Sequence, residues 1–269
     1  MSIMVLCNPT TKECVEVPLN IEQVPAGYNR LFDSNFGYDP VTDTYKVLRI
    51  DIYYSTTDLG YTEVYVYTLG NKVWRKIQTI FRPMNWYNAS YVHGAFHWFK
   101  LADKSTWNDK PPHLDSSSII SFDVGSEEFR TVPWIKMAKS GDTANTVVLG
   151  VIQECLSVSH QYNKEGCIDI WLMKDYGVKE SWTKVFSLSL KGGLFNCAPM
   201  IVLENGELII RHGENGKLLD EKGNLYAYNI QRQTISKAIP IGVWRTAFIF
   251  VESLVSISSI GTQEDVDMG

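Results

Sequence analysis

The amino-acid sequence predicts an all-β fold, a β-propeller built from four-stranded antiparallel blades. Three observations predict it. Segments that read as pairs of strands recur at a regular period, and a short polar or glycine-containing turn joins the two strands of each pair, as in a β-hairpin. No long stretch keeps the i, i+3, i+4 apolar spacing of an amphipathic helix, so we expect little helix.

One series of hairpins is marked by the residue that opens its second strand. In chain order these residues are Cys14, Trp74, Phe129, Trp182 and Ile235. Successive members are 60, 55, 53 and 53 residues apart. A period this regular indicates repeats of one structural unit rather than unrelated strands.

A second series of hairpins interleaves with the first. Its turns lie near Pro40, Gly94, Glu154, Gly206 and Ser253. Runs of this series such as VVLGVI and PMIVL are continuously apolar, which is typical of strands buried on both faces. Runs of the first series such as EVYVY and WRKI alternate, which indicates one solvated face. Each blade is therefore predicted to contain an inner hairpin followed by an outer hairpin.

The two series together predict about five blades. Four complete blades are expected at residues 34–77, 88–132, 147–187 and 198–239. Residues 3–18 supply only an outer hairpin and residues 247–257 only an inner one, so the ends of the chain are complementary half-blades. We expect residues 248–257 to pair with residues 4–17 and close a five-blade ring; the alternative is an open arc of an incomplete six-blade ring.

Composition and charge limit the kinds of partner and the compartment that we expect. The propeller domain is predicted to span residues 1–257, followed by an acidic flexible tail at residues 258–269. A net charge of −5 and a pI near 5.6 argue against binding to nucleic acid or to an anionic membrane. No secretory leader and no apolar run of about 20 residues is found, so we expect a chain of the cytoplasm, with the nucleus as a second compartment.

The five cysteines fit neither a zinc site nor a CxxC redox motif. We expect them to be reduced and mostly buried thiols. Cys7 and Cys14 flank a turn and could face each other across a hairpin, but a reducing cytosol disfavours a disulfide there.

The sequence predicts neither an enzyme nor a metal or cofactor site. The five histidines lack metal-binding spacing, and GxSxG, P-loop and GxGxxG motifs are absent. His97 is expected to be a hydrogen-bonded strand histidine. The carboxylate pairs Glu127–Glu128 and Asp39 with Asp43 fall in turns, where we expect structural roles.

A binding surface is predicted from the lengths of the connections. Tight turns within hairpins should share one face of the disc, and the longer connections between hairpins should share the other. That loop face mixes aromatic with polar residues, as protein-recognition surfaces do. The candidate partner-binding residues are Tyr53, Tyr54, Trp86, Tyr87, Trp107, Asp109, His160, Tyr162, Glu214 and Asp220.

An ordered set of motifs resembles the F-box-associated domain, the C-terminal region of plant F-box proteins. The motifs are LCNPTTKECVEVP, GYDPVTDTYKVLRI, EVYVYTLGNKVWRKI, YVHGAFHWF, IISFDVGSEEFRTVP, IDIWLMKDYGVKESWTKVFSL and LYAYNI. Within this family, IWLMKDYGVKESWTK is most similar to the S-locus F-box group, which acts in pollen during self-incompatibility.

The resemblance implies the substrate-recognition part of an SCF-type ubiquitin ligase receptor. In such a receptor this domain binds a target protein, and a helical F-box binds the Skp adaptor and, through it, the cullin. The S-locus group implies a pistil ribonuclease as target; such proteins tend to be basic, and a chain of net charge −5 would attract them. Met1 is followed almost at once by a hairpin, so we expect a truncated receptor that cannot bind the adaptor alone.

Two other functions stay open at this point. A propeller enzyme could act on a glycan or a small metabolite through converging carboxylates or histidines on the loop face. A truncated remnant without function would fold poorly and would leave unpaired strand edges exposed.

Overall fold

The computed structural model describes eleven stretches of the chain, and every structural statement below refers to them. They are residues 3–19, 23–55, 60–71, 73–77, 89–100, 118–135, 146–162, 167–189, 198–211, 224–240 and 252–257. Regular structure in these residues is β-strand apart from one 3-10 turn, η2 (Lys179–Ser181). None of the helical residues in these stretches forms a segment that could cross a membrane.

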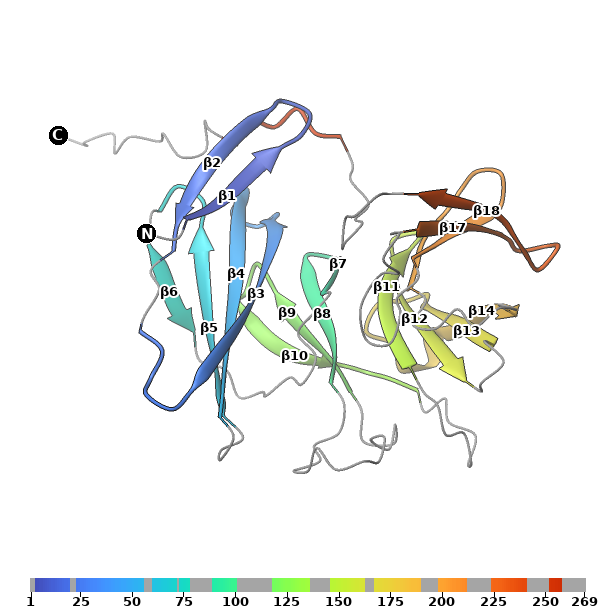
Figure 1. Ribbon diagram of the computed structural model, residues 1–269, viewed down its shortest axis with the longest axis horizontal. Helices are drawn as coiled ribbons and strands as arrows, with labels where there is room; N and C mark the ends of the chain where they lie inside the picture. Colours follow the sequence, from blue (N-terminus) through green and yellow to red (C-terminus); the bar gives the residue numbers. More distant parts are fainter. Residues whose placement is uncertain are drawn as a thin grey trace. The chain divides into compact units, whose positions relative to one another are not determined.

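The strands form four four-stranded sheets and one hairpin, which confirms the predicted fold class (Figure 1). Neighbours in each sheet follow chain order, as expected of propeller blades. The hairpin is β1 (Ile3–Asn8) and β2 (Glu13–Pro18); the sheets are β3 (Asn29–Asp39), β4 (Thr44–Tyr54), β5 (Tyr61–Thr68) and β6 (Trp74–Ile77); β7 (Ser90–Val92), β8 (Ala95–Lys100), β9 (Ser118–Asp123) and β10 (Glu128–Val132); β11 (Thr146–Ile152), β12 (Cys155–Tyr162), β13 (Cys167–Met173) and β14 (Trp182–Ser189); and β15 (Ala198–Val202), β16 (Glu207–Arg211), β17 (Asn224–Asn229) and β18 (Thr234–Pro240).

The chain divides into two compact units. The first consists of Met1–Arg82, Asp123–Glu128 and Phe250–Gly269, and the second of Pro83–Phe122 and Phe129–Ile249. The first unit therefore holds the N-terminal hairpin, the first sheet and the β9–β10 turn. The predicted boundary between a domain of residues 1–257 and a tail of residues 258–269 stays a prediction, and the tail lies outside the described residues.

In the second unit the first strands of successive sheets lie next to one another. β11 contacts β7 on one side and β15 on the other, as inner strands of neighbouring blades should. Apolar side chains fill the layers between the sheets. One buried cluster includes Phe99, Leu149 and Trp182, and the next includes Ile170, Leu208 and Tyr228, so the β11–β14 sheet is packed on both faces.

Burial along the strands differs from the prediction for two runs. VVLGVI in β11 is mostly half-buried, and PMIVL exposes Ile201 (38%) and Leu203 (37%), so neither run is buried on both faces. The second strand of each of three sheets is buried on both faces, over Val47–Ile50 of β4, Ala95–Phe99 of β8 and Leu156–Gln161 of β12. The third strands β5 and β13 alternate instead between buried and partly exposed residues. The second strand of the inner hairpin thus lies between two layers of side chains, whereas the strand that follows it keeps one side toward water.

The outermost strand pairs of the last two sheets carry register irregularities at equivalent places. The β13–β14 pairing shifts between Ile170 and Trp171, and the β17–β18 pairing shifts between Ala227 and Tyr228. A bulge of this kind bends the strand and increases its twist.

The described end of the chain meets the N-terminal hairpin, but not as a strand. Residues 252–257 contain no strand, so the inner hairpin predicted around Ser253 is not seen in them, and residues 248–251 lie outside the described part. Ile257 is buried with Val17, Val47 and Tyr67 in one apolar cluster. Side-chain hydrogen bonds from the hairpin, rather than a ladder of backbone hydrogen bonds, hold this segment.

The prediction that all cysteines are reduced and mostly buried is wrong for the first two. Cys7 and Cys14 are disulfide-bonded, and both are exposed on the β1–β2 hairpin. The antiparallel register explains the pairing because it places the two residues directly opposite each other. Cys155 and Cys167 are free and half-buried, and Cys197 lies outside the described residues.

Candidate partner-binding surface

Three of the ten predicted contact residues have side chains within the described part of the chain. Trp86, Tyr87, Trp107, Asp109, Glu214 and Asp220 lie outside the described residues, as does the side chain of Tyr162 at the end of β12. Tyr53, Tyr54 and His160 remain, and all three are strand residues rather than loop residues.

Tyr53 and Tyr54 end β4 and point to opposite faces of the first sheet, as consecutive strand residues must. Tyr53 is 2% exposed, and its ring stacks on that of Tyr61 with the ring centres 4.6 Å apart. Burial raises the pKa of its phenol. Tyr54 is 41% exposed. Tyr53 therefore supports the sheet, whereas Tyr54 is available to a partner.

His160 lies inside β12, between Val147 on β11 and Asp169 on β13. The side chain is 3% exposed, which leaves a partner almost nothing to contact. The sequence placed His160 in a loop because the polar run after it reads as a connection, but β12 continues to Tyr162. Its burial in the sheet argues for a packing role instead.

A tyrosine cluster, defined as Tyr28, Tyr53 and Tyr61, lies at the same end of the first sheet. The ring of Tyr28 meets Tyr61 edge-on at 5.7 Å, and Tyr61 stacks on Tyr53. Gly60 makes this packing possible: its φ is +71°, and a Cβ at this position would lie 1.7 Å from the carbonyl oxygen of Tyr53. Only glycine allows the chain to pass so close.

The neighbouring strand β3 is the edge strand of this sheet and exposes large apolar side chains. Leu31 is 43% exposed and lies on the same face as Tyr54, while Phe32 is 53% exposed on the other face. We call Leu31, Phe32 and Tyr54 the exposed edge. Leu31 and Phe32 are not among the residues predicted from the sequence, although the apolar pair in NRLFD, next to the aromatic end of β4, is a signal for them.

Buried ion pairs lie on the same face of the first sheet as Phe32. The guanidinium of Arg49 donates two hydrogen bonds of 2.7 and 2.6 Å to the carboxylate of Asp51, and both residues are buried. Arg30 adds a third charge, 3.8 Å from Asp51. The guanidinium carbon of Arg49 lies 5.5 Å from the centre of the Phe32 ring, so a fixed cation backs the exposed aromatic ring.

Glu63 organises the outer part of the same face. Its carboxylate accepts a 2.7 Å hydrogen bond from the Tyr65 hydroxyl and pairs with the ammonium of Lys76. Burial alone would raise the pKa of Glu63, but the hydrogen bonds from Lys76 and Tyr65 lower it overall. Lys76 stays largely exposed, and its ammonium lies 5.9 Å from the centre of the Tyr65 ring.

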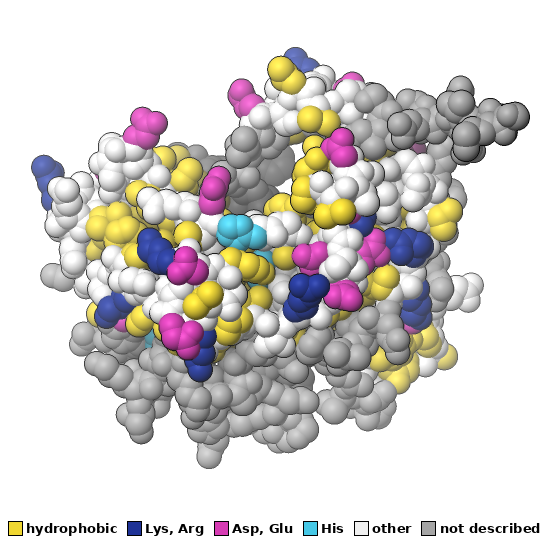
Figure 2. Space-filling model, turned by 180° about the vertical axis from the view of Figure 1, so that it is seen from behind, with side chains coloured by type: hydrophobic (Ala, Val, Ile, Leu, Met, Phe, Trp, Pro, Cys, Tyr) yellow, Lys and Arg dark blue, Asp and Glu magenta, His cyan; other side chains and the backbone are white. Residues whose placement is uncertain are grey.

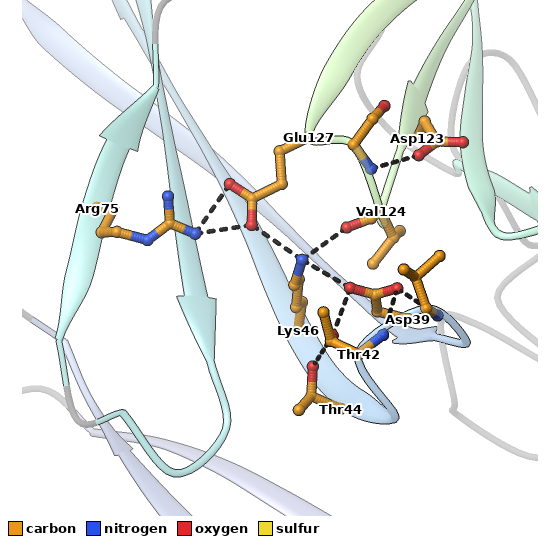
Figure 3. A network of polar contacts seen from close by, with 10 residues as sticks. Asp39, Thr42, Thr44, Lys46, Arg75, Asp123, Val124 and Glu127 are labelled. Carbon is orange, nitrogen blue, oxygen red and sulfur yellow. Dashed lines mark hydrogen bonds and ion pairs between the residues drawn. The ribbon is translucent and has the colours of Figure 1, made fainter.

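A second polar network belongs to the tight turns of the first unit, and it is structural (Figure 3). The Lys46 ammonium lies 2.9 Å from carboxylate oxygens of both Asp39 and Glu127, and donates to the carbonyl oxygen of Val124. Burial would raise the pKa of Asp39, but hydrogen bonds from Thr42 and Lys46 lower it to about 2. Arg75 binds the outer side of Glu127.

Chemically, this arrangement is suited to recognition. The exposed ring of Phe32 lies against a buried ion pair that holds it in place, which lowers the entropy lost when a partner binds. No three potential metal ligands come together in the described residues. Hydrophobic, acidic and basic side chains are interspersed over the face drawn in Figure 2, without the basic stripe that nucleic-acid binding needs.

Comparisons with known proteins agree on one family. A family model described as the F-box associated beta propeller domain matches residues 2–257. The chain is 28% identical over 200 residues to the F-box protein CPR1 of Arabidopsis thaliana, a match that covers 67% of this chain and 46% of that protein. From the same organism, the F-box/kelch-repeat protein At3g23880 is 25% identical over 82% of this chain and 55% of its own, and the F-box protein At3g07870 is 28% identical over 80% and 52%. The chain spans about half the length of these relatives.

Proposed function

Because the chain belongs to the F-box associated β-propeller domain family, we propose that it is the target-binding region of a receptor for an SCF-type ubiquitin ligase. In this proposal the propeller holds a target protein, and an F-box joined to it binds the Skp adaptor and the cullin. Such a receptor would act in the cytoplasm or the nucleus.

The exposed edge is the observation that carries the proposal. Leu31 and Tyr54 expose apolar and aromatic surface on one face of the first sheet, and Phe32 exposes its ring on the other face, at the end of the sheet where β3 begins and β4 ends. Interfaces between proteins are enriched in aromatic residues that a well-packed support holds in place. We include in the same surface the predicted loop residues that lie outside the described part: Trp86, Tyr87, Trp107, Asp109, Glu214 and Asp220.

We further propose that the receptor is of the S-locus F-box type and that its target is a basic pistil ribonuclease. Two features support this finer assignment: the IWLMKDYGVKESWTK motif and the net charge of −5. Attraction between a net negative receptor and a basic target speeds association, and this gain falls as salt is added.

The experiment compares three triple variants of the full chain in binding to a purified basic pistil ribonuclease. The edge variant carries Leu31→Ala, Phe32→Ala and Tyr54→Ala, and the loop variant carries Trp86→Ala, Tyr87→Ala and Trp107→Ala. The control replaces exposed valines near tight turns, with Val41→Ala, Val73→Ala and Val178→Ala. Because a few aromatic contacts supply most binding energy, we expect the edge and loop variants to raise the Kd at least about tenfold and the control to leave it unchanged.

Melting curves of all variants separate loss of binding from loss of folding. Equal Kd values for the edge, loop and control variants would show that the target binds elsewhere. Absence of ribonuclease binding by the unmodified chain would contradict the finer assignment only. The broader proposal is tested by capture from extract with the chain carrying a grafted F-box. The grafted form should recover Skp adaptor and cullin together with a protein that the edge and loop variants no longer hold, and recovery of the ligase subunits without any such protein would contradict a receptor role.

A further inference from the structure

The disulfide of the β1–β2 hairpin lies next to the contacts that hold the end of the chain. Cys7 on β1 and Cys14 on β2 form a directly opposed pair whose Cα atoms are 4.1 Å apart. The next pair along the ladder, toward the turn, is Asn8 and Glu13. Both cysteines are exposed, so a small thiol or disulfide can reach them from solvent.

Asn8 uses both ends of its amide. Its Oδ1 accepts a 2.9 Å hydrogen bond from the backbone N–H of Thr10 and thereby closes the hairpin turn. Its Nδ2 donates to the carbonyl oxygens of Ser253 at 3.0 Å and Val255 at 2.9 Å. The same buried side chain therefore shapes the turn and binds the C-terminal segment.

Glu13, on the opposite strand, also binds the C-terminal segment. One carboxylate oxygen accepts a 2.8 Å hydrogen bond from the Ser256 hydroxyl, and the other accepts a 3.0 Å hydrogen bond from the backbone N–H of Ile257. These bonds seat Ile257 in the apolar cluster that contains Val17 and Val47. We call Asn8 and Glu13 the clasp.

We propose that Cys7 and Cys14 are a reversible redox site that controls how firmly the clasp holds residues 253–257. The clasp works only when Asn8 and Glu13 keep a fixed spacing across the hairpin. A two-stranded hairpin is marginally stable without further support, and a covalent bond between the adjacent pair fixes that spacing.

The chemistry is thiol–disulfide exchange with a glutathione-type disulfide. The thiolate of one cysteine attacks the oxidant, forms a mixed disulfide and releases one small thiol. The thiolate of the other cysteine then attacks the mixed disulfide, forms the Cys7–Cys14 bond and releases the second small thiol. Two protein thiols are thus oxidised, one small disulfide is reduced to two thiols, and excess small thiol reverses both steps.

Hydrogen exchange of the full chain, followed by mass spectrometry, tests the proposal. The protein is equilibrated with glutathione disulfide or with dithiothreitol, and exchange is measured in the peptide that contains residues 252–257. We expect the oxidised form to weigh two hydrogen atoms less, and reduction to speed exchange in this peptide about tenfold. Failure to form the intramolecular disulfide, or equal exchange in both forms, would overturn the proposal.

Two matched variants locate the effect. Replacing the free cysteines by Cys155→Ser and Cys167→Ser should leave the response intact, whereas Cys7→Ser with Cys14→Ser should abolish it and fix exchange at the fast rate. A response that survives in the second variant would assign it to another thiol and overturn the proposal. Glu13→Gln tests the clasp itself: it should speed exchange of the Ile257 amide even in the oxidised form, and unchanged exchange would refute the clasp.

Discussion

The phenol of Tyr176 donates a 2.7 Å hydrogen bond to Nε2 of His97, which is fully buried. Nδ1 of the same ring lies 3.1 Å from the carbonyl oxygen of Ser90, which can only accept, so the proton belongs on Nδ1. Tyr176, in the turn between β13 and β14, thereby supplies the hydrogen-bond donor for a buried histidine of β8 in the neighbouring sheet. The contact links two blades of the second unit through one polar residue on each.

Replacing Tyr176 with Phe should destabilise the second unit. The change leaves Nε2 of the buried His97 without its donor, and an unsatisfied buried polar group costs about 1–3 kcal/mol. Urea unfolding at pH 7 measures the effect. Val178→Ala in the same exposed turn is the control and should change the free energy of unfolding by less than about 0.5 kcal/mol. Equal effects of the two substitutions would contradict the role given to the hydroxyl.

Stability should fall as the pH decreases from 6.5 to 4, because of His97. Burial lowers the pKa of His97 from 6.5 to about 4, so within this range the unfolded chain takes up a proton that the folded chain does not. The free energy of unfolding therefore decreases toward acid, by at most about 3 kcal/mol. Below pH 4 this contribution no longer changes.

Unfolding in urea at several pH values checks that dependence. His97→Gln should show a shallower decrease between pH 6.5 and 4 than the unmodified chain. A slope that is unaffected by His97→Gln would assign the pH dependence to other groups.

Lys46→Met should destabilise the first unit strongly. Lys46 is the cation between Asp39 and Glu127, and its removal leaves the fully buried carboxylate of Asp39 without a charged partner. Breaking a buried ion pair in this way costs about 3–5 kcal/mol. Thermal or urea unfolding provides the measurement.

Arg75→Ala is the matched control for that network. Arg75 also binds Glu127, but its side chain is 52% exposed compared with 8% for Lys46, so the loss should stay within about 1 kcal/mol. A cost for Arg75→Ala as large as that for Lys46→Met would show that burial does not govern the network.

Gly60→Ala should disturb the tyrosine cluster. The new Cβ would meet the Tyr53 carbonyl, so the backbone must shift, and we expect a loss of about 2 kcal/mol or more together with weaker target binding. Gly27→Ala offers a matched comparison because Gly27 also has a positive φ, of +84°, but nothing lies within 4 Å of its Cβ position. Similar losses at the two positions would attribute the effect to backbone strain alone.

Local pattern predicted the strands well because turn chemistry and apolar periodicity act over short distances. The spacing of Trp74, Phe129 and Trp182 located three outer strands: β6 and β14 begin at the two tryptophans, and Phe129 is the second residue of β10. Strand ends were harder to predict. Tyr53 and His160 were assigned to loops because the residues after them are polar, yet pairing with neighbouring strands extends β4 and β12 past both.

Contacts between distant residues could not be predicted from periodicity. Tyr176 and His97 are 79 residues apart, and Asn8 and Val255 are 247 apart, so no window of sequence contains either pair. The sequence indicated that Cys7 and Cys14 could face each other across a hairpin. It did not predict their disulfide, because a reducing cytosol was expected to prevent it. The antiparallel register of the β1–β2 hairpin places the two cysteines directly opposite each other.

The bulges between β13 and β14 and between β17 and β18 have a consequence for behaviour in concentrated solution. Each outer strand twists away from the plane of its sheet, and each carries a lysine, Lys184 or Lys237, in the segment that a foreign strand would have to pair with. Polymerisation through these rims would bury ammonium groups and require the strands to flatten. Preparations of the folded chain should therefore resist fibril growth by this route, and fibres that do form should begin from unfolded molecules.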